Sequence, residues 1–332
     1  MGGFWINADT YVSTLAEIAG IKSGLAVSRV RLSRLLKADG SPMPTKSAPG
    51  MHFRAEEFEE IVHQLLFRLG VIRSPGLMQP GIALSHRFRG DEQRSRALED
   101  ALQLFTDHSE QEMESRKDVK SLSLPWFLPM MRGLHGSIGE EVGILFLEDT
   151  NEFLYASPWS NIEQSAYSKR LSLDELYNRE QSSESDNEYF DSRFIRFLNR
   201  NFEEVDRIHW RQFENMTAEF LKGLGFEVKL GPGRNDGGID IRARLVDPSS
   251  RSITILVQCK RVKGYLDTVY LKALHDDVQY EKADRGLLVT TSRLTKGHAA
   301  VIEQRSHRVE GIDRPKVEQW LTEMVKMARP II

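Results

Sequence analysis

The stretch from residue 231 to residue 261 constrains the fold of this chain most strongly, because its pattern is that of a β-hairpin. Residues 239–245 alternate apolar and polar side chains, as a half-buried strand does, and residues 252–259 form a β-branched apolar run typical of a buried strand. Asp-Pro-Ser-Ser at 247–250 supplies turn chemistry between them. We therefore predict that the start of the first strand lies beside the end of the second.

The predicted hairpin gathers three polar side chains around one point. Asp240 stands near the start of the first strand, and Gln258 and Lys260 stand near the end of the second. Gln258 and Lys260 are two residues apart, so both side chains leave the same face of the strand. Carboxylate and amide oxygens suit Mg²⁺, and a lysine can orient the attacking water or stabilise developing charge. The set predicts metal-assisted phosphodiester hydrolysis; the alternative is a strand pair that ends in ordinary solvated charges.

Two neighbouring residues leave alternatives open. Asp236 precedes Asp240 by four residues and can bind a second metal ion, hydrogen-bond the turn or lie in solvent. Cys259 is the only cysteine, so it cannot form an internal disulfide or a cysteine-rich zinc site. Because Cys259 alternates with the two site residues of its strand, we expect it to point to the opposite face as a small buried group rather than act as a nucleophile.

The same residues resemble the sequence motif of a known protein family. Gly237-Gly238-Ile239-Asp240, followed by Gln258-Cys259-Lys260, resembles the core of the Mrr-type restriction endonucleases of the PD-(D/E)xK nuclease superfamily. The likeness covers residues 190–325 and includes the Phe213-Glu214 helix and the strand at 286–292. It implies a mixed sheet flanked by helices, and cleavage of DNA that depends on Mg²⁺, with Mn²⁺ as a substitute.

The same resemblance assigns catalytic roles to four residues. Asp240 falls on the metal-binding aspartate, Lys260 on the catalytic lysine, and Gln258 replaces the more common acid as a metal ligand. Glu214 falls on the helix glutamate that completes the metal site, although near a helix start it can instead stabilise the helix dipole. An amide attracts a divalent ion less than a carboxylate does, so a Glu214 that points away predicts low metal affinity and a slow enzyme.

The charge distribution favours nucleic-acid binding by the C-terminal part alone. Residues 201–332 hold 22 Lys and Arg against 19 Asp and Glu, a net of +3, whereas residues 101–200 hold 10 against 18, a net of −8. The acidic middle therefore cannot be a DNA track. Arg261 and Lys263, just after the catalytic lysine, are predicted contacts to DNA phosphates. The hydroxyls of residues 290–292 either touch a phosphate or cap the next helix.

The length of 332 residues suggests two or three domains. Gln-Ser-Ser-Glu-Ser-Asp-Asn-Glu at 181–188 is acidic, rich in serine and without an apolar period, so we predict a linker there. It separates an N-terminal domain of residues 1–180 from a nuclease domain of residues 189–332. The expected fold class is α/β, with a mixed-sheet, restriction-endonuclease-like core at the C-terminus. The preceding domain is expected to be mainly helical, with a small β-hairpin formed by residues 142–147 and 152–156.

The N-terminal region is predicted to recognise the target or to regulate the nuclease. Residues 8–37 read as two helices separated at Gly20, and the second carries four basic residues: Arg29, Arg31, Arg34 and Lys37. That outline fits a helix-turn-helix, but plain helical packing gives the same pattern. Trp126, Tyr155 and Trp159 similarly fit a nucleotide-stacking surface or a set of core aromatics.

Several sequence features bear on location and partners. No apolar run approaches the roughly 18–20 residues of a membrane span, and the first residues lack the pattern of a secretory signal. With one cysteine in the chain, a reducing environment fits, so we expect a cytoplasmic protein without a membrane partner. The expected partner is double-stranded DNA. One active site cuts one strand at a time, so cleavage of both strands predicts a homodimer or a larger homo-oligomer.

These observations predict a Mg²⁺-dependent DNA endonuclease. The resemblance alone extends this to restriction of foreign DNA, modified DNA included. One alternative is a DNA-binding or regulatory protein on a nuclease fold with little cleavage, which an assay of Mg²⁺-dependent nicking distinguishes. Another is a repair or junction nuclease of the same superfamily, for which preferential cleavage of a junction substrate is the distinguishing result.

Overall fold

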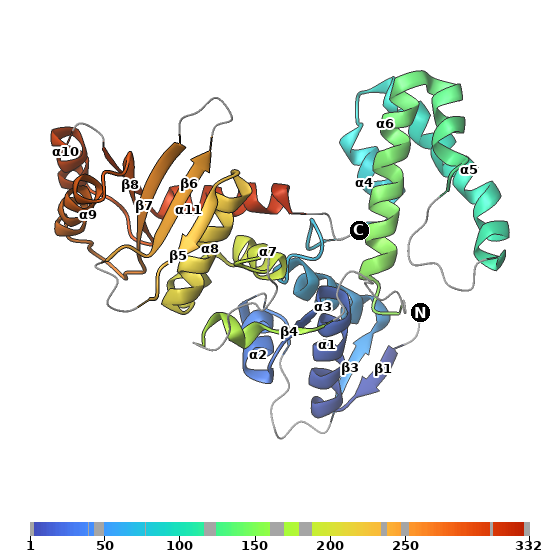
Figure 1. The fold of residues 1–332 in the computed structure, drawn as a ribbon. Helices are drawn as coiled ribbons and strands as arrows, with labels where there is room; N and C mark the ends of the chain where they lie inside the picture. The colour runs from blue at the N-terminus through green and yellow to red at the C-terminus, as the bar shows by residue number, and fades with distance from the viewer. Residues whose placement is uncertain are drawn as a thin grey trace. The chain divides into compact units, whose positions relative to one another are not determined.

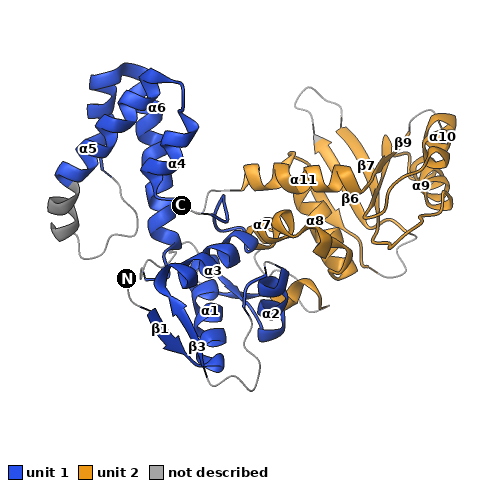
Figure 2. Cartoon of the chain, turned by 180° about the vertical axis from the view of Figure 1, so that it is seen from behind, with its two compact units in different colours: residues 1–172, 330–332 blue, residues 173–329 orange. Residues whose placement is uncertain are grey.

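The chain divides into two compact units, residues 1–172 with 330–332 and residues 173–329 (Figure 2). The computed structural model describes residues 3–38, 40–42, 50–76, 78–115, 124–159, 169–178, 188–233, 238–246, 252–305 and 308–328. The predicted linker at 181–188 lies outside these ranges except for Glu188, so the predicted domain boundaries stay a prediction. Within the described ranges, no helix has the length and hydropathy to cross a bilayer.

Helices dominate the N-terminal unit, as predicted (Figure 1). In chain order it contains β1 (Gly3–Ile6), α1 (Ala8–Ser23), β2 (Leu25–Ala26), α2 (Arg29–Ala38), β3 (Met51–Arg54), α3 (Ala55–Arg68), α4 (Pro80–Arg87), α5 (Glu92–Ser115), α6 (Phe127–Ala156) and β4 (Leu171–Ser172). Strands β1 and β3 pair antiparallel, and β2 pairs with β4 in parallel. The aromatic rings of Tyr11 and Phe53 stack at 5.3 Å and anchor the β1–β3 pair on α1.

The predicted β-hairpin at residues 142–147 and 152–156 is wrong, because this segment belongs to helix α6. Its buried side chains recur at helical spacing, from Val142 to Phe146 to Thr150. Thr150, in the predicted turn, donates its hydroxyl to the carbonyl of Phe146 one helical turn earlier, at 2.6 Å. The apolar residues of the segment satisfy both a strand and a helix period, and packing of α6 against α5 selects the helix.

The predicted break at Gly20 is also wrong. Helix α1 continues to Ser23 and ends at Gly24, whose φ of 68° lies in the left-handed region that glycine adopts readily. The N–H of Gly24 closes the helix by donating to the carbonyl of Gly20 at 3.1 Å. Strand β2 then separates α1 from α2, so these helices are not joined by a simple turn, which favours packing over a helix-turn-helix.

The three aromatic residues considered for nucleotide stacking have different surroundings. Tyr155 is buried and donates its hydroxyl to the carbonyl of Lys22. Trp126 packs against the apolar core formed by α4, α5 and α6. Trp159 lies edge-on to Phe4, at 6.1 Å between ring centres. Burial removes Tyr155 from any nucleotide surface, so the interpretation as packing aromatics holds for that residue.

The C-terminal unit is a five-stranded mixed sheet flanked by helices, as predicted. In chain order it contains η1 (Leu173–Leu176), α7 (Ser192–Arg200), η2 (Phe202–Asp206), α8 (Trp210–Gly223), β5 (Glu227–Leu230), β6 (Ile241–Val246), β7 (Ser252–Lys260), α9 (Val269–Tyr280), β8 (Arg285–Thr290), α10 (Lys296–Gln304), β9 (Val309–Ile312) and α11 (Arg314–Met327). The strand order is β5-β6-β7-β8-β9; β5, β6 and β7 are antiparallel neighbours, and β7, β8 and β9 are parallel ones.

Helices cover the two faces of this sheet in two groups. Figures 1 and 2 show α9 and α10 on one side of the strands and α8 and α11 on the other. On the α9 side, Leu256 of β7 and Leu288 of β8 share an apolar core with Leu271 and Leu274 of α9. Side chains alternate along a strand, so the even-numbered residues of β7 face α9 and the odd-numbered ones face α8.

Candidate active site

The predicted hairpin places Asp240 beside Gln258. The strand register pairs Ile241 of β6 with Val257 of β7, so Asp240, just before Ile241, lies at the same end of the hairpin as Gln258. The Asp240 N–H donates to the carbonyl of Val257 at 2.9 Å, and its carboxylate accepts the N–H of Cys259 at 2.6 Å. Asp240 is 8% exposed and Gln258 is 5% exposed. Two backbone contacts thus fix a buried carboxylate next to a buried amide.

Gln258 and Lys260 lie on the same face of β7, as their spacing predicts. That face carries Leu256 and packs on α9. Lys260 is half-buried at the end of the strand, and its Nζ lies 5.2 Å from the centre of the Tyr270 ring. Tyr270, in the first turn of α9, is a neighbour that sequence reasoning missed. A cation over an aromatic face is stabilised by the ring, which holds the ammonium near the strand end.

The side-chain oxygen of Gln258 is the atom in this site that most clearly indicates a bound ligand. This Oε1 atom is buried and has no hydrogen-bond partner among the described residues. Leaving such an oxygen unsatisfied costs about 1–3 kcal/mol, so a partner outside the described residues is expected. An amide oxygen next to a carboxylate fits a hard divalent cation. The residues present therefore fit the predicted metal site.

Gly238 makes space for the Gln258 amide because it has no side chain. Its φ is 94°, and a β-carbon added there would lie 2.8 Å from Nε2 of Gln258. We expect Gly238→Ala to displace the amide, to reduce DNA nicking strongly and to cost about 1–2 kcal/mol of stability. Gly90→Ala is the matched control, because Gly90 has a φ of 89° with no atom within 4 Å of the added carbon.

The two variants separate backbone strain from the local clash. Urea unfolding should show similar losses of stability, whereas nicking should fall for Gly238→Ala alone. Equal nicking by the two variants would mean that the position of the Gln258 amide does not matter to activity.

Glu214 is buried on helix α8 and does not lie in the first turn of that helix. Helix α8 begins at Trp210 and is capped by His209, whose ring accepts the N–H of Arg211 at 3.2 Å. Glu214 lies beyond the first turn and is 5% exposed, so stabilisation of the helix dipole does not explain it. Its carboxylate accepts a hydrogen bond from the Arg211 guanidinium at 2.8 Å.

The buried thiol of Cys259 connects Glu214 with the hairpin. Burial raises the pKa of Cys259 well above its usual value, and the charges of Asp240 and Glu214 raise it further. Both carboxylates therefore lie close to this one side chain, which has Thr217 of α8 as a neighbour. The prediction that Cys259 is a buried group on the face opposite Gln258 is confirmed, and its raised pKa argues against a nucleophilic role.

The remaining candidates fall in different environments. Asp236 lies outside the described residues. Arg261 donates from Nη1 to the carbonyl of Asp206 at 2.8 Å, so part of its guanidinium holds the η2 segment. Lys263 is exposed. Over the described part of the chain, no three His, Cys, Asp or Glu side chains gather into a metal-binding group, which leaves two carboxylates and an amide as the candidate ligand set.

The hydroxyls of residues 290–292 neither cap the next helix nor stay open for a phosphate. Thr295 is the N-cap of α10. Thr290 Oγ1 donates to the carbonyl of Lys260 at 2.8 Å, and Thr291 Oγ1 bonds both the N–H and the carbonyl of Val262 at 3.0 Å each. The parallel pairing of Lys260 with Thr290 explains this arrangement, because it aligns the ends of β7 and β8.

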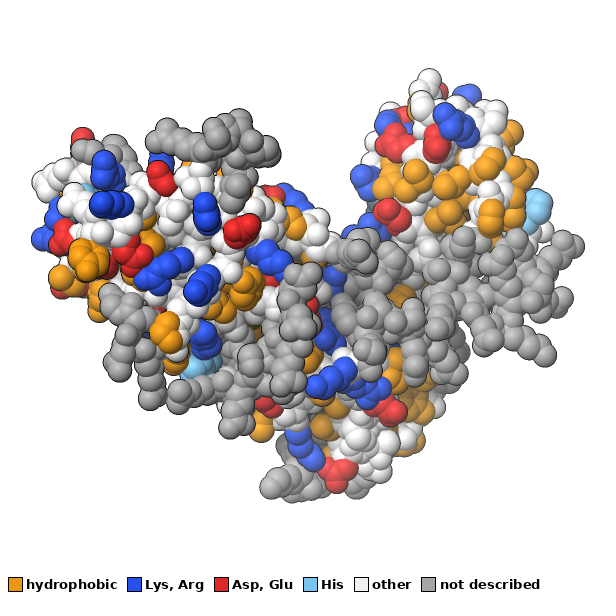
Figure 3. Space-filling view, in the orientation of Figure 1, with side chains coloured by type: hydrophobic (Ala, Val, Ile, Leu, Met, Phe, Trp, Pro, Cys, Tyr) orange, Lys and Arg blue, Asp and Glu red, His pale blue; other side chains and the backbone are white. Residues whose placement is uncertain are grey.

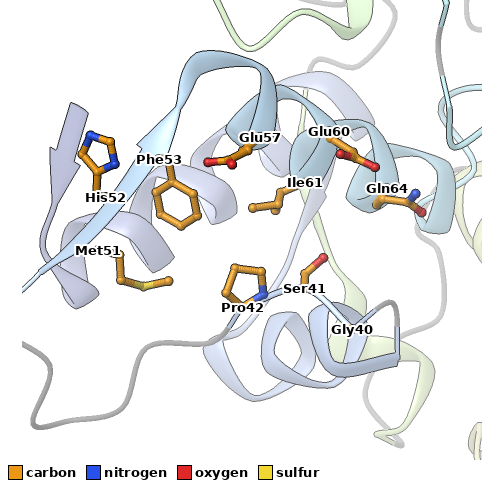
Figure 4. A pocket seen from close by; sticks show the side chains of 10 residues that line it. All are labelled: Gly40, Ser41, Pro42, Met51, His52, Phe53, Glu57, Glu60, Ile61 and Gln64. Atoms are coloured by element: carbon orange, nitrogen blue, oxygen red, sulfur yellow. The ribbon is translucent and has the colours of Figure 1, made fainter. Parts of the chain in front are cut away.

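A separate pocket of about 460 Å³ lies in the N-terminal unit (Figure 4). Ten residues line it: Gly40, Ser41, Pro42, Met51, His52, Phe53, Glu57, Glu60, Ile61 and Gln64. Its two carboxylates disfavour a phosphate, and Glu57 is held by hydrogen bonds to the backbone and side chain of Arg54. The pocket therefore gives no reason to place phosphodiester chemistry outside the C-terminal unit.

Comparison with known proteins supports a restriction-endonuclease-like C-terminal unit. Residues 205–321 match the family model Mrr_cat, described as restriction endonuclease. Over 145 residues the chain is 26% identical to the uncharacterized protein y4cE of Sinorhizobium fredii (strain NBRC 101917 / NGR234), a match covering 41% of this chain and 35% of that relative. The chain thus spans about a third of the length of this curated relative.

One solved structure also aligns, the MspJI restriction endonuclease in complex with a 27-mer oligonucleotide. The TM-score is 0.31 at 16% sequence identity, with 57% of this chain and 41% of that chain covered. The family model, which spans the sheet and α8 to α10, confirms the resemblance to Mrr-type restriction endonucleases for the C-terminal unit.

Proposed function

We propose that this protein is a metal-dependent endodeoxyribonuclease whose active site is formed by Asp240, Gln258, Lys260 and Glu214. The observation that carries the proposal is the buried amide oxygen of Gln258, which has no partner among the described residues. Asp240 bonds the residues on either side of Gln258, Val257 and Cys259. The restriction endonuclease match over residues 205–321 supports hydrolysis of a phosphodiester bond as the reaction.

Asp240, Gln258 and Glu214 are the proposed metal ligands, with Mg²⁺ as the expected ion and Mn²⁺ as a substitute. Glu214 lies on the α8 side of the sheet, near Cys259, so it is proposed to complete the site from the side opposite Gln258. A divalent cation bound there would lower the pKa of its water and neutralise charge on the phosphate. The N–H of Cys259 orients the carboxylate of Asp240 toward the end of the hairpin. Glu214 adds a second negative charge, which offsets the neutral amide, although its ion pair with Arg211 weakens that contribution.

Lys260 is the proposed catalytic lysine. Its ammonium lies at the end of β7, two residues after Gln258 on the same face. There it would orient the attacking water or stabilise negative charge on the phosphate as the bond breaks. Tyr270 limits the positions that the ammonium can adopt, since Nζ lies over its ring.

Double-stranded DNA is the proposed substrate. The net charge of +3 over residues 201–332 supports approach of a polyanion, and Lys and Arg side chains spread over the face of the C-terminal unit seen in Figure 3. Lys263 is the proposed phosphate contact nearest the active site, with Arg261 beside it. Cleavage of both strands would need two active sites, so a homodimer or larger homo-oligomer is part of the proposal.

Restriction of foreign DNA, modified DNA included, is the proposed biological role, and the family description supports it. Comparing cleavage of methylated and unmethylated plasmid tests this role. The alternative of DNA binding with little cleavage draws support from the neutral Gln258 and from the ion pair of Glu214, since both lower the expected metal affinity. Tight DNA binding without Mg²⁺-dependent nicking would favour that alternative.

Gln258→Glu tests whether Gln258 is a metal ligand, because the change is expected to increase the affinity for Mg²⁺. A carboxylate attracts Mg²⁺ more strongly than an amide, so the Mg²⁺ concentration that supports half-maximal nicking should fall about tenfold. Gln279→Glu makes the same chemical change at an exposed position near the end of α9 and should leave the Mg²⁺ dependence unchanged. Identical Mg²⁺ curves for both variants and the wild type would remove Gln258 from the ligand set.

A further inference from the structure

The segment that follows Lys260, residues 261–268, is anchored through its backbone by two hydroxyl side chains that follow β8. We call it the 261–268 loop. Thr291 Oγ1 bonds both the N–H and the carbonyl of Val262 at 3.0 Å, and Ser292 Oγ donates to the carbonyl of Gly264. Both hydroxyl residues are buried. The first half of the loop is therefore fixed by two buried hydroxyl side chains that directly follow β8.

The second half of the loop is fixed by the core and by helix α9. Leu266 is 1% exposed and packs in the apolar core with Leu271 and Leu274. Asp267 accepts the N–H of Val269 at 2.9 Å and so holds the start of α9. Between these anchors residues 263–265 form a tip. The carbonyl of Gly264 is held by Ser292, but Gly264 has a φ of 99° and no atom lies within 4 Å of where its β-carbon would be.

The tip presents an exposed cation and an exposed aromatic ring. Lys263 is exposed, and Tyr265 is 69% exposed, with its ring edge-on to His298 at 6.1 Å. Single exposed apolar residues are common on proteins, but this ring stands on a loop tied down at both ends. Preorganisation of this kind lowers the entropy lost when a partner binds.

The tip is also close to the proposed active site along the chain. Lys263 follows Lys260 by three positions, so their Cα atoms lie at most about 11 Å apart. That span corresponds to about three base pairs along a DNA duplex. A duplex held with one phosphate at Lys260 therefore has its neighbouring nucleotides within reach of the tip.

We propose that the tip of the 261–268 loop enters a groove of bound DNA next to the scissile phosphate. Lys263 pairs with a backbone phosphate, and the ring of Tyr265 packs on the sugar and base edge of a nearby nucleotide. Both are positioning residues, which set where the duplex lies relative to Lys260. This inference rests on the proposed nuclease function. Thr291 and Ser292 would hold the loop in the position that DNA binding requires.

The test measures binding and cleavage separately in the full chain. Affinity for a labelled DNA duplex is measured by fluorescence anisotropy in EDTA at several salt concentrations, and nicking is measured with Mg²⁺. Tyr265→Ala should weaken affinity about tenfold, because loss of one aromatic contact with a nucleotide has that order of effect. Tyr265→Phe should stay near the wild type, since the ring is retained.

Lys263→Ala should lower the slope of log affinity against log salt by about 1, as expected for one lost phosphate contact. Tyr280→Ala is the matched control, because Tyr280 is 88% exposed at the opposite end of α9. It should change neither quantity. Lys263 is exposed, so Lys263→Ala keeps the test valid even where Tyr265→Ala disturbs folding.

Failure of this inference is distinguishable from failure of the proposed function. A wild-type protein that neither binds nor nicks DNA would overturn both. A wild type that binds and nicks, with Tyr265→Ala and Lys263→Ala both matching Tyr280→Ala, would overturn the role of the loop alone. A loss in Tyr265→Phe equal to that in Tyr265→Ala would overturn the packing of the ring.

Discussion

Replacement of Asp240 with asparagine is expected to lower Mg²⁺-dependent nicking of supercoiled DNA by at least about a hundredfold. Asp240 supplies a negative charge beside the neutral Gln258, and its carboxylate is largely buried. The asparagine side chain keeps the shape, and its oxygen can still accept the N–H of Cys259. The loss should therefore report on the lost charge rather than on an altered hairpin.

Asp284→Asn is the matched control for this prediction. The carboxylate of Asp284 accepts the N–H of Thr254 at 2.8 Å, so it bonds the same strand, β7, at the end away from Lys260. We expect Asp284→Asn to nick DNA at close to the wild-type rate. Full activity in Asp240→Asn, or an equal loss in both variants, would contradict the assignment of Asp240 as a metal ligand.

The second large effect is expected for Lys260→Ala, with a fall in nicking rate on the order of 10²–10³. The ammonium is proposed to act on the attacking water or on the phosphate as charge develops, so its removal should affect the rate of cleavage. The metal ligands remain, so the Mg²⁺ concentration at half-maximal activity should stay near the wild-type value. Single-turnover nicking across a Mg²⁺ series measures both quantities.

Two further variants complete the lysine test. Lys260→Arg keeps the positive charge but changes its shape and hydration, so we expect only partial recovery of the rate. Lys316→Ala removes a lysine whose Nζ donates to the carbonyl of Gly311 at 3.1 Å, at the β9–α11 connection. It should leave nicking unchanged. A Lys260→Ala protein that nicks as fast as Lys316→Ala would remove Lys260 from the catalytic residues.

The hairpin could be predicted from the sequence because the residues that determine it are close together in the chain. Alternation along residues 241–245 and the apolar run of β7 fix which face is buried, and a short connection fixes the direction of pairing. Placement of Asp240 beside Gln258, and of Lys260 on the same face as Gln258, follows from that register. That the oxygen of Gln258 has no partner among the described residues could not be predicted, because it depends on every atom packed around the amide.

Features that depend on distant segments were missed or left open. The anchoring of Val262 by Thr291 needs the parallel pairing of β7 with β8, whose strands are joined through helix α9. The burial of Glu214 depends on where α8 starts, which His209 sets. The apolar residues of 142–156 fit both the two-residue period of a strand and the 3.6-residue period of a helix. Packing against α5 favours the helix.

Nicking of supercoiled plasmid by the wild type, in Mg²⁺ and in EDTA with Lys260→Ala alongside, tests the central claim most directly. We predict that the wild type nicks in Mg²⁺ alone and that Lys260→Ala is slower by about two to three orders of magnitude. If neither protein cuts the plasmid in Mg²⁺ while both bind it equally, the account of a catalytic site at Asp240, Gln258 and Lys260 is contradicted.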